Sequence, residues 1–333
     1  MTHPSDMTAS VSPPLLSIVV PLYNEEQNIE PLYQRLKAAL SPLDLRHELI
    51  LVDNGSRDHT LAILKQLASL DPCVTYLTLS RNFGHQGGLV AGLEHARGEV
   101  VVSLDGDLQH PPEFIPSMIA QWRLGFDVVY TLKRDDRSIS FLRKQTNILF
   151  YRLMSRLSGL NITVGQSDFR LMNRAALDAM LALPERTRFL RGLAQWIGFR
   201  QIGLEFQVER RHAGNSKYRF KDLVNFAING IFSFSILPLR LFTLIGSGVS
   251  LLALGYAAYN LLITWYKQFM DIPTVAGYPT LSVGIFFLGG VQLIGIGLLG
   301  EYLGKVYDEV KQRPTYILRE RSTPREAPEE RPA

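Results

Sequence analysis

Cysteine is nearly absent from this sequence, since Cys73 is the only one among 333 residues. A single cysteine cannot close a disulfide within the chain and cannot supply a cysteine-based metal site. Two glycine-rich nucleotide motifs are missing as well: there is no Gly-x-x-x-x-Gly-Lys, and no Gly-x-Gly-x-x-Gly follows the first predicted strand. These absences argue against a disulfide scaffold, a P-loop ATPase and a dinucleotide-dependent dehydrogenase.

Charge is absent from two long apolar runs near the C-terminal end, residues 241–266 and 272–300. A membrane-spanning helix needs about 20 apolar residues. We therefore expect a transmembrane hairpin over residues 241–304, with spans at about 241–266 and 279–303. Buried core helices of a soluble enzyme are the alternative interpretation.

The cations around these runs predict an orientation. Lysines and arginines lie before the first span and after the second, whereas the connecting loop has only Lys267, balanced by Asp271. The positive-inside rule then places both termini, and everything before residue 240, in the cytosol. The segment 219–240 has the pattern of an amphipathic helix that lies in the membrane interface.

Neither end of the chain has the pattern of a folded element. Residues 1–14 have no basic start and no apolar stretch, so they predict a disordered tail rather than a signal peptide. Residues 305–333 are expected to form a cytosolic tail that is disordered from Arg319 onward, where the sequence is charged and rich in proline. A net charge of +4 is weak evidence for a membrane surface or for nucleic acid.

Between residues 15 and 132, short β-rich apolar runs alternate with segments of helical periodicity. This alternation predicts an α/β fold with a mostly parallel sheet and helices on both faces. Asn24 is the expected N-cap of the first helix, with Gln27 at the capping-box position. The expected strands cover 15–23, 47–53, 74–79, 98–105 and 126–132, and the expected helices cover 24–40, 58–70, 86–96 and 111–122.

Polar clusters follow the first four predicted strands. Ligands of such sheets bind outside the carboxyl ends of the strands, so these clusters predict one site. The most specific of them contains Asp105 and Asp107. A metal clamp, a general acid/base pair, a turn and a solvated loop are four interpretations of this pair. Magnesium and manganese favour oxygen ligands, and Gln109 adds a carbonyl oxygen, so a metal-bound diphosphate is the favoured interpretation.

The motifs taken together identify a resemblance. From about Leu16 to Tyr316 the chain resembles family 2 glycosyltransferases of the polyprenyl-phosphate branch, which includes dolichol-phosphate mannosyltransferases and bactoprenol glucosyltransferases. The resemblance rests on "SIVVPLYNEE", "LILVDNGSRDHT", "RNFGHQGGLVAGLEHARGEVVVSLDGDLQHPPE", "SDFRLMNR", "PERTRFLRGLAQWIGFR", "AGNSKY" and the segments that flank the two apolar runs.

The resemblance implies a GT-A nucleotide-sugar-binding domain over residues 15–218 and a role for each matching residue. Asp105, Asp107 and Gln109 would hold the donor, the last two through Mg²⁺ or Mn²⁺. Asp168 and Arg170 would face the reacting centre as catalytic residues, unless they are only a structural ion pair. The family commonly has Asp where this chain has Asn54, which affects base recognition. The nucleoside pocket would comprise Pro21, Tyr23, Glu25 and Asp53, and the phosphate-binding residues would be Arg211, Ser216 and Lys217.

The implied activity is inverting transfer of one sugar to undecaprenyl or another polyprenyl phosphate on the cytosolic face of the bacterial inner membrane. Glucose from UDP-glucose is the favoured donor, and GDP-mannose, UDP-N-acetylglucosamine and a UDP-aminoarabinose derivative are alternatives. A processive synthase is disfavoured because its Gln-x-x-Arg-Trp motif is missing, and an inactive membrane scaffold or nucleotide sensor is the alternative of another class. The chain is expected to form a homo-oligomer and to work with a flippase for the lipid-linked sugar. Nucleic acid is not expected as a partner.

Overall fold

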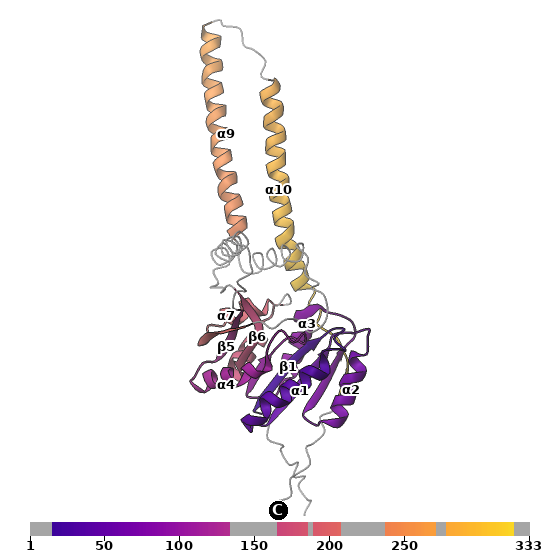
Figure 1. The fold of residues 1–333 in the computed structure, drawn as a ribbon. Helices are drawn as coiled ribbons and strands as arrows, with labels where there is room; N and C mark the ends of the chain where they lie inside the picture. Colours follow the sequence, from indigo (N-terminus) through magenta and orange to yellow (C-terminus); the bar gives the residue numbers. More distant parts are fainter. Residues whose placement is uncertain (1–14, 134–164, 186–188, 208–236, 271–277, 323–333) are drawn as a thin grey trace, which may run out of the picture. The chain divides into compact units, whose positions relative to one another are not determined.

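The structure is a computed structural model that describes residues 15–133, 165–185, 189–207, 237–270 and 278–322. The chain divides into two compact units, which are considered separately. The sheet unit contains residues 1–152, 160–218 and 313–333, and the helical unit contains residues 153–159 and 219–312. Figure 1 shows the elements of both units along the chain.

The sheet unit is built on one eight-stranded sheet in the order β7-β5-β6-β4-β1-β2-β3-β8. β1 pairs in parallel with β2 and β4, β2 with β3, and β5 with β7, whereas β6 and β8 run antiparallel to their neighbours. The predicted α/β fold with a mostly parallel sheet is confirmed. The strands are β1 Leu16–Leu22, β2 His47–Asp53, β3 Val74–Leu79, β4 Val100–Ser103, β5 Val128–Lys133, β6 Gln166–Asn173, β7 Gln201–Phe206 and β8 Leu318–Arg321.

Helices cover both faces of this sheet (Figure 1). Strand residues alternate between the faces, so Ile18 and Val20 pack under one set of helices while Val19 faces the other. The Ile18 face carries α1 Ile29–Leu40, α2 Thr60–Leu70 and α4 Ile115–Arg123, with short 3₁₀ turns at Ser41–Leu43 and Pro112–Phe114. The opposite face carries α3 Gly84–His95, α6 Arg174–Leu181 and α7 Leu190–Trp196.

The first helix begins later than the sequence predicts. Asn28, not Asn24, is the N-cap residue of α1, and Asn24 has a positive φ of 53°. The side chain of Asn24 instead accepts a hydrogen bond from the backbone N–H of Arg57 at 2.8 Å. The backbone N–H of Glu25 donates to Thr60 Oγ1 at 3.0 Å. These bonds to the loop after β2 and to the first residue of α2 hold the residues that follow β1 outside the helix, and capping propensity alone does not reveal them.

The C-terminal end was also predicted wrongly in part, because strand β8, Leu318–Arg321, includes residues 319–321, which were expected to be disordered. β8 pairs with the edge of β3, and Glu320 accepts a hydrogen bond from Tyr76 Oη at 2.7 Å and pairs with Lys65 at 2.8 Å. A charged, proline-rich composition indicates disorder, but an open strand edge offers such a segment backbone partners. The strand therefore depends on tertiary pairing that local composition does not encode.

The helical unit has two helices of 33 residues each, α9 Leu237–Phe269 and α10 Tyr278–Val310. Both predicted spans fall within these helices. Among the described residues, Phe287–Val310 is the one stretch long and apolar enough to cross a membrane, and Leu239–Ala253 is a shorter apolar stretch. The two helices approach each other where the ring of Phe242 occupies the space that a Cβ atom at Gly295 would need.

Candidate active site at the carboxyl ends of the strands

The register of the sheet brings the predicted polar strand ends together. Leu22 at the end of β1 pairs with Asp53 at the end of β2, and the N–H of Leu104 after β4 donates to Val19 O at 3.1 Å. β6 runs antiparallel to β4, and the Oγ of Ser103 donates to Asp168 O at 2.7 Å. The segments after β1, β2 and β4 therefore lie at one edge of the sheet with the early part of β6.

The loop that carries Asp105 and Asp107 has a constrained backbone. Gly106 lies so close to Leu22 that a side chain at this position would collide with it. Leu108 has a φ of 62°, a conformation that costs a residue with a side chain about 1–3 kcal/mol. The N–H of Gln109 donates to Asp107 Oδ1 at 3.1 Å, which closes a tight turn. Strain of this kind concentrates at functional sites, and here it places both aspartates at the strand end.

The side chain of His110 anchors the loop of Asp105 and Asp107 to β6, a role that the sequence did not reveal. Its ring is fully buried and stacks on Phe169, with ring centroids 5.3 Å apart. Nδ1 accepts a hydrogen bond from the N–H of Asp105 at 3.0 Å, and Nε2 lies 2.7 Å from Ser167 Oγ. Burial lowers the pKa of His110, which agrees with a neutral ring whose Nδ1 is an acceptor. His110 thus fixes the backbone of Asp105 without adding charge.

Asp168 is paired with Arg191 rather than with Arg170. Arg191 donates from Nε to Oδ1 at 2.9 Å and from Nη2 to Oδ2 at 2.7 Å. Burial alone would raise the pKa of Asp168, but the guanidinium of Arg191 and a hydrogen bond from His85 outweigh it and hold this pKa well below its usual range. Asp168 is therefore an ionised carboxylate at neutral pH.

Arg170 lies beneath the site. Its side chain is 3% exposed and donates to the carbonyl oxygens of Leu190 at 3.1 Å and Ser167 at 3.4 Å. Burial lowers the pKa of Arg170 to about 10, so it remains a cation at neutral pH. Among the described residues its Nε has no hydrogen-bond partner. The structure thus places Arg170 against α7, with Asp168 as an electrostatic neighbour rather than a direct partner.

His85 is a second residue that the sequence did not single out. It lies in the first turn of α3, and its Nε2 is 3.4 Å from Asp105 Oδ1 and 3.5 Å from Asp168 Oδ2. Burial by itself would lower the pKa of His85, but the hydrogen bond to Asp168 and the charges of both carboxylates raise it to about 9. The ring therefore carries a positive charge at neutral pH and lies between two catalytic candidates.

The predicted nucleoside-pocket residues are fixed by neighbouring groups. Pro21 is buried within β1, and Tyr23 is half-buried just after that strand. Glu25 Oε2 accepts from Asn28 Nδ2 at 2.5 Å, and the buried Asp53 accepts from the N–H of Ser56 at 2.9 Å. All of them lie at or just after the ends of β1 and β2.

Asn54, where the resemblance leads one to expect Asp, bonds the protein itself. Its Nδ2 donates to Gly84 O at 2.8 Å, and its Oδ1 accepts from the N–H of Phe83 at 2.9 Å. A carboxylate could accept from Phe83, but its second oxygen would face the carbonyl of Gly84 without a proton. The amide therefore anchors the loop before α3. The predicted phosphate-binding residues Arg211, Ser216 and Lys217 lie outside the described residues.

The chemistry of the turn at Asp107 and Gln109 fits a hard divalent cation. A carboxylate and an amide supply only oxygen atoms, which Mg²⁺ and Mn²⁺ prefer, and few protein ligands leave room for a diphosphate. In the described part of the chain, no group of three or more His, Cys, Asp or Glu side chains has an arrangement that could hold a metal by itself. A cation held by Asp107 and Gln109 would complete its coordination with oxygens of water or of a ligand.

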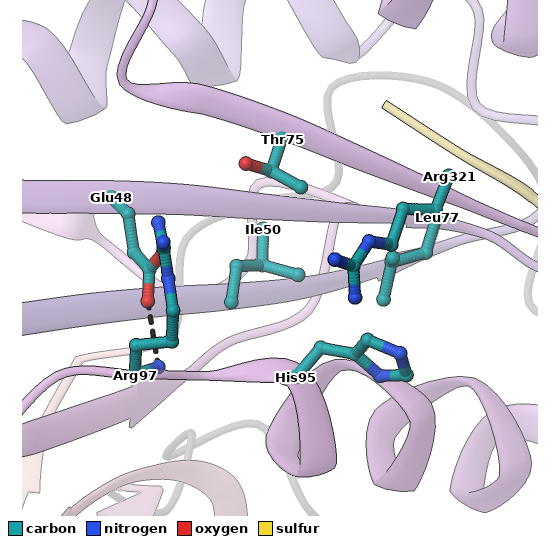
Figure 2. Close-up of a pocket in the computed structure, with 7 residues that line it drawn as sticks. All are labelled: Glu48, Ile50, Thr75, Leu77, His95, Arg97 and Arg321. Carbon is teal, nitrogen blue, oxygen red and sulfur yellow. Dashed lines mark hydrogen bonds and ion pairs between the residues drawn. The ribbon is translucent and has the colours of Figure 1, made fainter. Parts of the chain in front are cut away.

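A small cavity lies at the opposite ends of the strands (Figure 2). This cavity of about 50 Å³ is next to the start of β2 and β3, and Arg97 bonds Glu48 on its wall. It is separate from the loop of Asp105 and Asp107, because Glu48 and Asp53 are at opposite ends of β2. Its other lining residues are Ile50, Thr75, Leu77, His95 and Arg321.

Comparison with known proteins defines the class. Residues 17–181 match the model of glycosyl transferase family 2, and residues 237–306 match that of the GtrB C-terminal hairpin. The chain is 45% identical to an uncharacterized glycosyltransferase of Synechocystis, covering 91% of this chain and 94% of that protein. The chain therefore belongs to glycosyl transferase family 2 and is a glycosyltransferase, as the resemblance predicted.

More specific relatives follow from the same comparison. The bactoprenol glucosyl transferase of Shigella phage SfII is 42% identical, over 91% of this chain and 97% of that protein. Among solved structures, glucosyl-3-phosphoglycerate synthase from Mycobacterium tuberculosis has a TM-score of 0.45 and 21% identity, covering 66% of this chain and 78% of that one.

Proposed function

We propose that this enzyme transfers glucose from UDP-glucose to undecaprenyl phosphate or a similar polyprenyl phosphate, with inversion at the anomeric carbon. The observation that carries the proposal is the similarity to the phage bactoprenol glucosyl transferase, 42% over 91% of the chain, which extends through the C-terminal hairpin. An enzyme acting on a soluble acceptor would not need the two long apolar helices α9 and α10. A different donor sugar remains the alternative.

The charges of the site suit attack by a lipid phosphate. A phosphate monoester has a second pKa of about 6, so it is mostly a dianion at neutral pH and needs no strong base. The low pKa of Asp168, held by Arg191 and His85, makes this carboxylate a poor proton acceptor. We therefore assign Asp168 to positioning rather than to general base catalysis.

Asp105 would hold the sugar of the donor, and Asp107 and Gln109 would hold Mg²⁺ or Mn²⁺ beside its diphosphate. Pro21, Tyr23, Glu25 and Asp53 would form the nucleoside pocket. The bound cation would supply positive charge for the leaving nucleoside diphosphate. Arg170 would support α7 from beneath, and the phosphate-binding positions are Arg211, Ser216 and Lys217.

The membrane arrangement is part of the proposal. We infer a membrane-bound enzyme with α9 and α10 as two spans, both termini in the cytosol, and residues 219–240 in the interface. A homo-oligomer and a flippase for the glycolipid product are further proposals. Reporter fusions after Ala333 and in the 267–278 loop test the topology, and a C-terminal reporter active only in the periplasm would refute it.

The substrate is tested directly by product analysis. Membranes that contain the enzyme are incubated with undecaprenyl phosphate and, one at a time, with UDP-glucose, GDP-mannose, UDP-N-acetylglucosamine and a UDP-aminoarabinose derivative. Mass spectrometry of the lipid fraction should show one hexose added from UDP-glucose. If only another donor gives a product, that sugar is the substrate instead of glucose. If none of the donors gives a product, the result favours an inactive scaffold or sensor. The Asp107→Asn variant is the matched negative control.

The acceptor assignment of Lys217 has its own test. A lysine acts on a phosphate as a point charge, so Lys217→Ala should raise the apparent KM for undecaprenyl phosphate more than that for the nucleotide sugar. Steady-state kinetics with each substrate varied in turn separates the roles. A rise in the donor KM alone would assign Lys217 to the donor diphosphate. If neither the acceptor KM nor the donor KM changes, Lys217 is a solvated charge with no role in binding either substrate.

A further inference from the structure

The position of His85 is unusual for a cationic side chain. It lies in the first turn of α3, where the helix dipole disfavours positive charge. Among the described residues, the ionisable groups that face it are Asp105 after β4, Asp168 on β6 and Arg191 on α7. Two carboxylates thus offset both the dipole and the repulsion of Arg191.

The backbone just before His85 is fixed in the position that lets the imidazole contact Asp105 and Asp168. Gly84 has a φ of 79°, a conformation that favours glycine, and the side chain of Asn54 bonds both Phe83 N and Gly84 O. The N–H of Gly84 also donates to Asn82 Oδ1 at 2.7 Å. A loop fixed by three hydrogen bonds delivers the imidazole to one place, between two carboxylates from different strands.

We propose that His85 is a positioning residue: its imidazolium links Asp105 to the Asp168–Arg191 pair and so sets the orientation of the Asp105 carboxylate towards the donor. The proposal rests on the proposed glycosyl transfer. His110 binds the N–H of Asp105 and fixes its backbone, and among the described contacts the ionisable side chains near the Asp105 carboxylate are His85 and His110. Nδ1 of His110 accepts the N–H of Asp105 and therefore carries no proton, which leaves His85 as the histidine that supplies positive charge.

The bridge predicts a defined dependence on pH. The charged form of His85 is favoured by the folded state, so its contribution is complete below pH 6.5, declines above that value and is lost as the pH rises through about 9. Activity that depends on the bridge should fall along a basic limb near the same pH. A neutral histidine with a purely structural role would give no such limb.

The experiment compares His85→Gln, His85→Lys and the wild type, all as full-length enzyme in detergent or nanodiscs. His95→Gln is the matched control, since His95 lies at the other end of α3 and bonds Ala91 O. We expect His85→Gln to lower kcat by about 10–100-fold, the scale of a misplaced catalytic group. It should also abolish the basic limb and leave the acceptor KM unchanged.

His85→Lys keeps the charge and should recover part of kcat while moving the basic limb upward, because a lysine has a pKa of about 10.4. His95→Gln should match the wild type. Wild-type kcat and an unchanged pH profile in His85→Gln would overturn the proposal, as would equal loss in His85→Lys and His85→Gln.

A second measurement does not depend on turnover. NMR titration of histidine-labelled full-length enzyme, with the His85 signal assigned by its absence in His85→Gln, should give a pKa near 9 that falls in Asp168→Asn. A pKa at or below about 6.5, the unperturbed value, would overturn the bridge even if transfer is confirmed. A raised pKa together with no transfer from any donor would instead refute the proposed function alone.

Discussion

Two buried carboxylate–arginine pairs lie at opposite ends of the same sheet, and they differ in what else they contact. Glu48 at the start of β2 is 5% exposed and pairs with Arg97, while Asp168 on β6 is 4% exposed and pairs with Arg191. In each pair the arginine donates from both Nε and Nη2. Residue type, burial and pairing therefore do not distinguish the candidate active site from the opposite end of the sheet.

The partners beyond each pair do distinguish them. The second oxygen of Glu48 accepts from Ser17 Oγ at 2.7 Å and from the N–H of Arg97 at 2.8 Å, and Ser17 in turn accepts from Gly98 N. This network ends on backbone groups. The network of Asp168 instead continues through His85 to Asp105. The two pairs therefore differ in that, among the described contacts, the network of Asp168 includes a further ionisable side chain and a second carboxylate.

The largest expected effect is a loss of activity caused by a substitution at the carboxyl ends of the strands. Asp107→Asn should lower transfer by about 100-fold or more, because the site loses a negative oxygen that would hold the cation beside the diphosphate. Its carboxylate is half-buried in a surface turn, so the free energy of unfolding should change by less than about 0.5 kcal/mol. Turnover and thermal unfolding of the purified variant measure both. Full activity at saturating Mg²⁺ would remove the metal assignment.

Glu48→Gln should show the reverse pattern. The amide cannot accept from all the donors that surround Glu48, so the free energy of unfolding should fall by about 1–3 kcal/mol. Arg97 is 54% exposed and can regain water, which limits the loss. Denaturant unfolding gives the stability, and kcat per folded molecule should equal that of the wild type. A lowered kcat with normal stability would mean that the amino ends of the strands influence transfer.

Much of the fold was predictable because its signals are local. The predicted bounds of the strands at 47–53 and 74–79 match β2 and β3, where turn residues flank short apolar runs. Asp105 and Asp107 were singled out because the strand before them, β4, has no polar residue ahead of Ser103. The parallel register then required the polar strand ends to meet.

The rest of the site depends on contacts between residues that are far apart along the chain. The resemblance singled out Arg170, with a structural ion pair to Asp168 as the alternative. On a strand, however, residues two apart share a face without needing to pair, and the partner of Asp168 is Arg191. His85 became significant only when α3 was placed over β4. β8 was missed for the same reason, since its hydrogen-bond partners are on β3.

The smallest expected effect concerns β8, which contributes Arg321 to the cavity at the amino ends of the strands. Tyr76→Phe removes the hydrogen bond from Oη to Glu320 at 2.7 Å, a bond that helps raise the pKa of Tyr76 to about 12. A hydrogen bond of this kind stabilises a protein by about 0.5–1.5 kcal/mol, and Glu320 can bind water and Lys65 instead, so we expect a loss at the low end of that range. Limited proteolysis should cut the C-terminal segment faster in the variant, while kcat and both KM values stay at wild-type levels. Unchanged proteolysis would show that the backbone pairing of β8 with β3 holds the strand without this side chain, and a lowered kcat would contradict the separation of the two ends of the sheet.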